Sequence, residues 1–337
     1  MKRYPLSSLL AILCNFTIAL PINQAFAEAT TPFYTANQNP LIQAHGLPPL
    51  EKGMITALNT TTSSTILDIA SASISESRQQ ESITLDGETY RLNFMFRHGI
   101  KRNVEIGIDI PYITHSGGML DGFIRNWHDA LGLSNSERDQ FQASQLRYEY
   151  NRNGVTQYRV VDKTDGIGDI KLSAAWQLRC AQSPQQRCSA LRVGLKLPTG
   201  KAEILTGSGG VNLSLALTTT RAYQRFTLNY AGGLLLNGRS DLLNDQQKPA
   251  VGFANLGLNY QPQRFSWMVL KAQLDGHSAF YDSALKNLGS NSFQITVGGT
   301  IQFSDKMALD LGVVEDIVIS TIPDVAFHLA LRMQHKR

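Results

Sequence analysis

The segment NSFQITVGGTIQF, residues 291–303, alternates between apolar and polar side chains almost throughout. One parity carries Phe293, Ile295, Val297, Ile301 and Phe303, and the other carries Gln294, Thr296, Gly298, Thr300 and Gln302. Successive side chains of a β-strand point to opposite faces, so the segment predicts a strand with one apolar and one polar face. The fold then depends on whether the apolar face meets a protein core or lipid.

The same alternation recurs along the chain and predicts an all-β protein. Further strands are expected at 88–100, 103–112, 168–178, 190–198, 211–217, 226–237, 254–260, 268–275, 307–313 and 325–333. A weaker alternation at 53–62 predicts a twelfth strand. An even number of strands is expected of a bacterial barrel whose two chain ends lie on one side.

The predicted connections alternate in length. Short connections fall at 101–103, 180–188, 221–225, 261–264 and 304–306, and longer ones at 63–86, 113–167, 198–210, 238–250 and 276–290. Short turns on one side and long loops on the other are typical of a transmembrane antiparallel up-and-down β-barrel. A soluble two-sheet sandwich with its polar faces outward is the alternative.

The polar faces of the predicted strands carry charges of both signs. In a membrane barrel these side chains line the lumen while the apolar faces meet lipid. The candidate lumen-lining residues are Arg91, Arg97, Glu105, Asp109, Lys171, Arg192, Lys196, Lys271, Asp310 and Arg332.

The N-terminal residues predict export. Residues 1–27 have a short positive start, an apolar stretch and Ala25-Phe26-Ala27, which together resemble a cleaved signal peptide. Residues 28–52 are rich in proline and predict an arm that either hangs in the periplasm or enters the lumen. The barrel is expected over 53–333, and the expected location is the cell outer membrane.

Two cysteines remain after the predicted signal peptide, Cys180 and Cys188, and both flank a short polar segment. In an exported protein this spacing predicts a disulfide that closes a turn, with two free thiols as the alternative. The segment offers too few ligands for a metal site.

The longest predicted loop contains GGMLDGFIRNWHDALGL, residues 117–133, whose apolar residues recur at helical spacing. This short helix either packs onto the barrel rim or contributes Asp121, Trp127 and His128 to a ligand site. Further on, Asn153-Gly154 lies between two alternating runs and predicts a tight hairpin beyond the membrane.

The sequence gives little support for an enzyme or for a metal or cofactor site. It contains no G-x-S-x-G segment and no H-x-x-x-H pair, and adjacent His-Ser pairs on a strand would point to opposite faces. A formal net charge of +4 without a basic run gives no indication of nucleic-acid binding.

Several segments together resemble a family of Gram-negative proteins catalogued as a domain of unknown function. They are FYTANQNPLIQAHGLP, DGETYRLNF, GGMLDGFIRNWHDALGL, GIGDIKLSAAWQL, LKLPTG, LTGSGG and PDVAFHLALR. The resemblance implies an exported outer-membrane barrel and brings no substrate, activity or catalytic residue with it. It implies patterned positions that meet: Asn39, Pro40, Gly46, Pro48, Gly118, Asp121, Trp127, His128, Gly168, Asp169, Lys196, Pro198, Gly200, Thr206, Gly207 and Ser208.

These features favour a narrow pore or facilitator for a small polar solute, with outer-membrane lipid as its surroundings. The first alternative is a non-conducting structural or surface-binding barrel that is plugged by its long loop and N-terminal arm. The second alternative is a membrane-embedded hydrolase. The sequence does not specify the oligomeric state.

Overall fold

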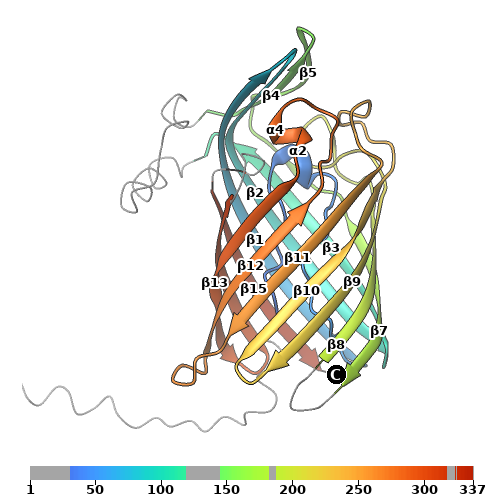
Figure 1. Cartoon of the computed structure of the whole chain (residues 1–337), viewed down its shortest axis with the longest axis vertical. Helices are drawn as coiled ribbons and strands as arrows, with labels where there is room; N and C mark the ends of the chain where they lie inside the picture. The colour runs from blue at the N-terminus through green and yellow to red at the C-terminus, as the bar shows by residue number, and fades with distance from the viewer. Residues whose placement is uncertain (1–30, 119–144, 182–186, 317–322, 324, 337) are drawn as a thin grey trace, which may run out of the picture.

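The wall of the molecule is a closed antiparallel β-barrel of twelve strands, seen side-on in Figure 1. The structure is a computed structural model that describes residues 31–118, 145–181, 187–316, 323 and 325–336. Strand β1 pairs with β15 over Thr60–Ser71, and this pairing closes the sheet. The wall strands are β1 (Thr60–Arg78), β2 (Glu81–Lys101), β3 (Val104–Ser116), β7 (Lys171–Ala181), β8 (Arg187–Lys196), β9 (Asn212–Tyr223), β10 (Phe226–Asn237), β11 (Ala250–Tyr260), β12 (Met268–His277), β13 (Ser292–Ser304), β14 (Met307–Asp316) and β15 (Val325–Lys336).

The side chains follow the inverted pattern of a membrane barrel. In β13, Phe293 and Val297 are each 52% exposed on the outer surface, whereas Thr296 between them is fully buried. In β9, Leu217 is 51% exposed and its neighbour Thr218 is buried. A soluble sandwich would bury the apolar parity between two sheets, so this pattern confirms the predicted barrel.

The first strand differs from its prediction. Residues 53–59 are not in β1, because wall side chains accept their backbone N–H groups: Gly53 donates to Thr220 at 2.8 Å and Thr56 to Glu105 at 2.6 Å. The predicted long connection at 63–86 is instead the β1–β2 hairpin. Its alternation is weak in the sequence because Ile66 and Ala70 point inward, where they are buried inside the barrel.

Three short strands extend the wall at the end opposite the short turns. β4 (Arg147–Arg152) pairs with the upper part of β2, β5 (Val155–Val160) pairs with β4, and β6 (Thr164–Ile167) pairs with β3. The predicted hairpin is confirmed, with Asn153 and Gly154 both in the left-handed conformation that such a turn requires. We call this end of the barrel the loop end and the opposite one the turn end.

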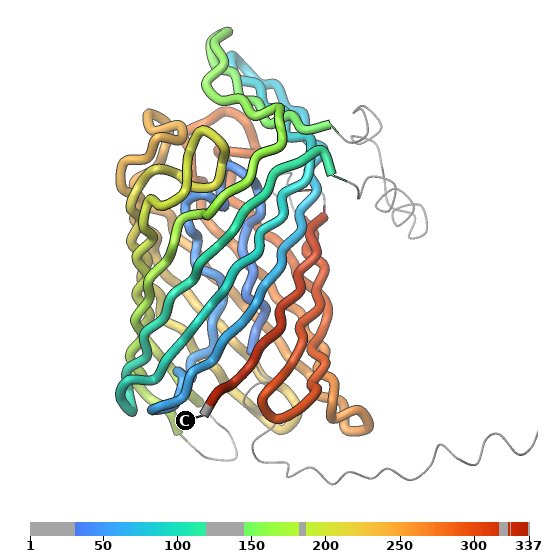
Figure 2. The backbone as a smooth tube through the Cα atoms, turned by 180° about the vertical axis from the view of Figure 1, so that it is seen from behind, coloured from blue at the N-terminus to red at the C-terminus, as the bar shows by residue number. Residues whose placement is uncertain are grey.

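The N-terminal arm, residues 31–59, lies inside the barrel. Two blue segments run through the lumen in Figures 1 and 2, one ascending towards the loop end and one returning. Helix α2 (Pro40–Gln43) forms the bend between them; Asn39 caps it by accepting the backbone N–H of Leu41 at 3.0 Å. A second short helix, α4 (Lys286–Gly289), lies between β12 and β13. None of the helices in the described ranges is long and apolar enough to cross a membrane.

An apolar core closes the barrel at the loop end. Leu41 and Ile42 of α2 are buried there together with residues of the β1–β2 hairpin, the β4 strand and three loops. Its largest members are Ile74, Ile83, Leu85, Tyr148, Tyr150, Phe280 and Tyr281. We call it the loop-end core. It holds the bend of the arm by burial of apolar area, whereas the lumen below it is polar.

Glu81 at the tip of the β1–β2 hairpin joins this hairpin to the neighbouring loops. It accepts hydrogen bonds from the Ser283 hydroxyl at 2.5 Å, the Ala284 N–H at 2.8 Å and the Gln246 amide at 3.0 Å. Partial burial raises the pKa of Glu81, but the hydrogen bonds from Ser283 and Ala284 outweigh it, so that the pKa lies below its ordinary value.

We expect acid to loosen this junction. Because folding lowers the pKa of Glu81, its contribution is complete above the ordinary value of 4.5 and is lost as the pH falls through the lower folded value. Hydrogen exchange, corrected for intrinsic rates, should show weaker protection of residues 81–85 and 283–285 below that pH. Glu81→Gln should remove most of this pH dependence; equal pH dependence in the variant would contradict the assignment.

We expect a cation in the middle of the outer surface to be costly. Leu217→Arg should lower the free energy of unfolding by about 2–4 kcal/mol in lipid vesicles, measured by denaturant titration. Tyr223→Arg, at the turn end of the same strand, is the matched control and should cost only about 0–1 kcal/mol. Equal costs at the two positions would contradict a lipid-facing wall.

Candidate functional site

The lumen gathers the charged side chains that the strand pattern singled out. Eight of them are buried: Arg97, Glu105, Asp109, Arg192, Lys196, Lys271, Asp310 and Arg332. Lys171 and Arg91 are partly buried. Because a buried charge needs a partner, the question is what neutralises these groups inside the barrel.

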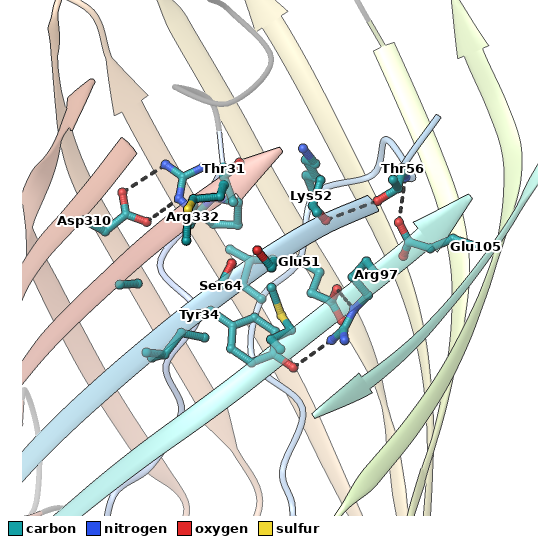
Figure 3. Close-up of a pocket in the computed structure, with 18 of the residues that line it drawn as sticks. Thr31, Tyr34, Glu51, Lys52, Thr56, Ser64, Arg97, Glu105, Asp310 and Arg332 are labelled. Atoms are coloured by element: carbon teal, nitrogen blue, oxygen red, sulfur yellow. Dashed lines mark hydrogen bonds and ion pairs between the residues drawn. The ribbon is translucent and has the colours of Figure 1, made fainter. Parts of the chain in front are cut away.

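Tyr34 of the ascending arm is held by three wall side chains. Its hydroxyl donates to Asp109 and accepts hydrogen bonds from Lys171 at 2.9 Å and Arg97 at 3.0 Å. Asp109 also forms ion pairs with Arg97 at 2.5 Å and with Lys171 at 3.1 Å. Figure 3 shows Tyr34 and Arg97 meeting inside the barrel.

Glu51 of the returning arm bridges two arginines. One of its carboxylate oxygens lies 3.3 Å from Arg97 Nε and 3.1 Å from Arg192 Nη1. Arg192 also pairs with Glu105 at 2.8 Å and donates to the Lys52 carbonyl at 3.0 Å. We call the combined set the arm-anchoring cluster: Tyr34, Glu51, Arg97, Glu105, Asp109, Lys171 and Arg192. It fastens both passes of the arm to the same side of the wall.

On the opposite side of the lumen, Asp310 accepts from two cations. Lys271 Nζ and Arg332 Nε each lie 2.8 Å from its carboxylate oxygens. The Phe33 ring of the arm covers this triad, with Lys271 Nζ 5.0 Å from the ring centroid. A cation over an aromatic face is attracted to the ring. Phe33 therefore covers the triad with apolar surface and also attracts the charge of Lys271.

Nearer the loop end, the arm makes neutral polar contacts. The Asn37 amide lies 2.9 Å from His277 Nε2 and donates to Ser292 at 3.2 Å. His45 Nε2 lies 2.6 Å from the Tyr281 hydroxyl, and the His45 carbonyl accepts from Asn212 at 2.9 Å. These contacts fix the position of α2 along the barrel axis, where its apolar side chains enter the loop-end core.

Another cluster joins five of the positions that the family resemblance singled out: Gly46, Asp169, Lys196, Gly200 and Ser208. Lys196 pairs with Asp169 and donates to the Ser208 hydroxyl at 2.7 Å. Asp169 in turn accepts the backbone N–H groups of Gly200 at 2.8 Å and Ser208 at 3.0 Å. Gly46 packs directly over Lys196, where an added Cβ would lie 2.6 Å from the lysine Cδ. These interactions position the 198–210 loop against the arm.

Several lumenal residues were missed from the sequence. Asp68 pairs with His328 at 2.6 Å, and Asp275 accepts from three amides. Those amides belong to Asn255, Gln273 and Gln294. The parity of Asp275 matched the polar face of its predicted strand and could have identified it. Tyr34 and Glu51 had no such pattern, since the arm is neither strand nor regular helix.

The arm leaves little free space in the lumen. Cavities of about 60, 30 and 20 Å³ lie between the arm and the wall; Figure 3 shows the residues around the first. Such spaces hold a few water molecules and are far below the roughly 300 Å³ of a small-molecule pocket. At these three places the arm and the wall leave room for only a few water molecules.

The remaining sequence candidates have different outcomes. Asp121, Trp127 and His128 lie outside the described residues. The structure joins Cys180 and Cys188 in a disulfide at the turn end. In the described part of the chain, no group of three His, Cys, Asp or Glu side chains is arranged to hold a metal ion. Ser63 and His335 do meet at 3.0 Å, but this pair is exposed near the turn end and offers no enclosed site.

We expect Glu51→Gln to loosen the arm. The change removes the carboxylate shared by Arg97 and Arg192 and should cost about 1–3 kcal/mol of local stability. Hydrogen exchange of residues 44–56 should accelerate about tenfold or more, while the wall strands keep their protection. Asp245→Asn, which removes an exposed ion pair with Arg152 at the loop end, is the matched control and should leave arm exchange unchanged.

Solved structures that are similar to this chain include two from Pseudomonas putida. The COG4313 outer membrane channel from Pseudomonas putida F1 is similar over 83% of this chain and 97% of its own, with 12% identity and a TM-score of 0.54. The toluene transporter TodX of Pseudomonas putida matches 92% of this chain and 96% of its own, with 9% identity and a TM-score of 0.37. The first likeness supports the outer-membrane barrel fold.

No curated protein matches the sequence. A family model described as "Protein of unknown function (DUF3187)" matches residues 8–335. That match spans the arm, every wall strand and the loops between them. The chain therefore belongs to this family.

Proposed function

We propose that this protein is an outer-membrane channel for small polar solutes and that its own N-terminal arm closes the lumen in the described conformation. The observation that carries the proposal is the arm-anchoring cluster. In it, charged wall side chains take part of their hydrogen-bond and ion-pair partners from the arm, through Glu51 and Tyr34.

The polarity of the interface favours reversible opening. When the arm leaves, water can solvate Arg97, Arg192 and their carboxylate partners. Exposing this part of the wall therefore costs little free energy. An apolar lumen would instead resist hydration. Since the wall is closed by backbone pairing between β1 and β15, it does not need the arm to stay closed as a sheet.

The loop-end core favours the second candidate, a non-conducting plugged barrel. Leu41 and Ile42 are 1% exposed in that core, so withdrawal of α2 would expose apolar surface at the mouth. If this core never opens, the arm is a permanent filling. Conductance measurements on variants of the arm separate the two candidates.

We expect the intact protein in a planar bilayer to be closed, with rare openings. A variant lacking residues 31–52 should conduct steadily, and Glu51→Gln should open more often than the wild type. Heat-dependent gel mobility, which reports the folded barrel, should be the same for all three proteins. A folded deletion variant without conductance would refute the channel and support the non-conducting barrel.

A further inference from the structure

The turn end carries a ring of exposed basic side chains that the lumen does not use. Every short turn of the described barrel contributes at least one of them. The ring, which we call the basic ring, consists of Lys101, Arg102, Arg179, Arg187, Arg221, Arg264 and Lys306. The five turns, 101–103, 179–187, 221–225, 261–267 and 304–306, contain a single acidic residue, Asp305. This segregation of sign differs from the mixed charge of the whole chain.

Side chains of the basic ring have no carboxylate partner among the described residues. The loop end is different: Arg152 pairs with Asp245 at 2.6 Å, and Arg147 and Arg159 both approach Glu149. The cations of the basic ring therefore have no described carboxylate beside them, whereas these three loop-end arginines each have one. Uncompensated like charges in a ring repel each other, so the arrangement costs free energy unless an anionic partner lies beside it.

Exposed aromatic side chains accompany the ring on its membrane side. Trp267 is 51% exposed and Phe303 55%, and each lies in or next to its wall strand, three residues from the basic residue of its own turn. Arg264 also lies over the Phe265 ring, 5.9 Å from its centroid. Aromatic residues mark the depth of the lipid headgroups in membrane proteins. The turns that carry Arg264 and Lys306 therefore lie just outside the hydrocarbon layer, at the depth of the lipid phosphates.

We propose that the basic ring binds the headgroups of anionic phospholipids in the membrane leaflet at the turn end. The basic ring is positively charged, lies just beyond the exposed aromatic residues and continues around the barrel. This arrangement fits a layer of lipid phosphates better than a single ligand. Short turns face the periplasm in outer-membrane barrels, so the leaflet concerned is the periplasmic one. The inference depends on membrane insertion and not on whether the lumen conducts.

Lipid enrichment can be read from Trp267. The chain has three tryptophans, so a Trp127→Phe, Trp176→Phe background leaves Trp267 as the reporter. The full chain is reconstituted in vesicles that contain phosphatidylcholine and phosphatidylglycerol, with brominated acyl chains on one or the other. We expect quenching to report a local phosphatidylglycerol fraction about threefold or more above the bulk fraction, falling as salt rises to 1 M.

Two charge-removal variants complete the test. Arg102, Arg221, Arg264 and Lys306 are changed to Gln in the first, which leaves Lys101, Arg179 and Arg187 in place and should lower the local fraction towards the bulk value. Lys163, Lys201, Arg239 and Lys286, at the loop end, are changed to Gln in the matched control, which should keep the enrichment. Equal quenching by both lipids in the parent, or equal enrichment in the two variants, would overturn the proposal. Each variant is first checked for folded gel mobility, and channel conductance is not part of the readout.

Discussion

The structure depends on the need to neutralise charges that point into a closed wall. Strand pairing satisfies the backbone of the barrel but leaves its inward side chains in a confined space. The wall residues Arg97, Arg192 and Lys171 meet the arm through Glu51 and the Tyr34 hydroxyl. The arm is consequently part of the electrostatic structure of the lumen as well as an obstacle in it.

The wall could be predicted almost completely from the sequence because its signal is local. Alternation of the kind seen at 291–303 requires only that one face meets lipid and the other water. It failed at β1, where Ile66 points inward and so belongs to the polar parity of the strand. Its burial reflects contact with the arm, a tertiary feature that strand periodicity does not encode.

The sequence predicted the lumenal cations but missed several of the acids that neutralise them. The missing acids left a charge imbalance in the predicted set. The predicted lumen residues comprise seven cations but only three carboxylates, Glu105, Asp109 and Asp310. A closed lumen does not tolerate such an excess, so further acids had to lie inside it. The structure supplies Glu51, Asp68, Asp169 and Asp275. Comparing the numbers of positive and negative residues in the predicted lumen could have indicated that further acids lie there. It could not have shown that one of them is on the arm.

The direct continuation of the arm into β1 has a kinetic consequence. Residue 59 is followed at once by the strand that seals the wall against β15, so an arm that leaves the lumen stays attached at its entrance. A tethered segment of this kind has an effective concentration near its own binding site in the millimolar range. If the arm opens as proposed, its reclosure is a unimolecular step whose rate is independent of protein abundance, and no second molecule is needed to close the barrel.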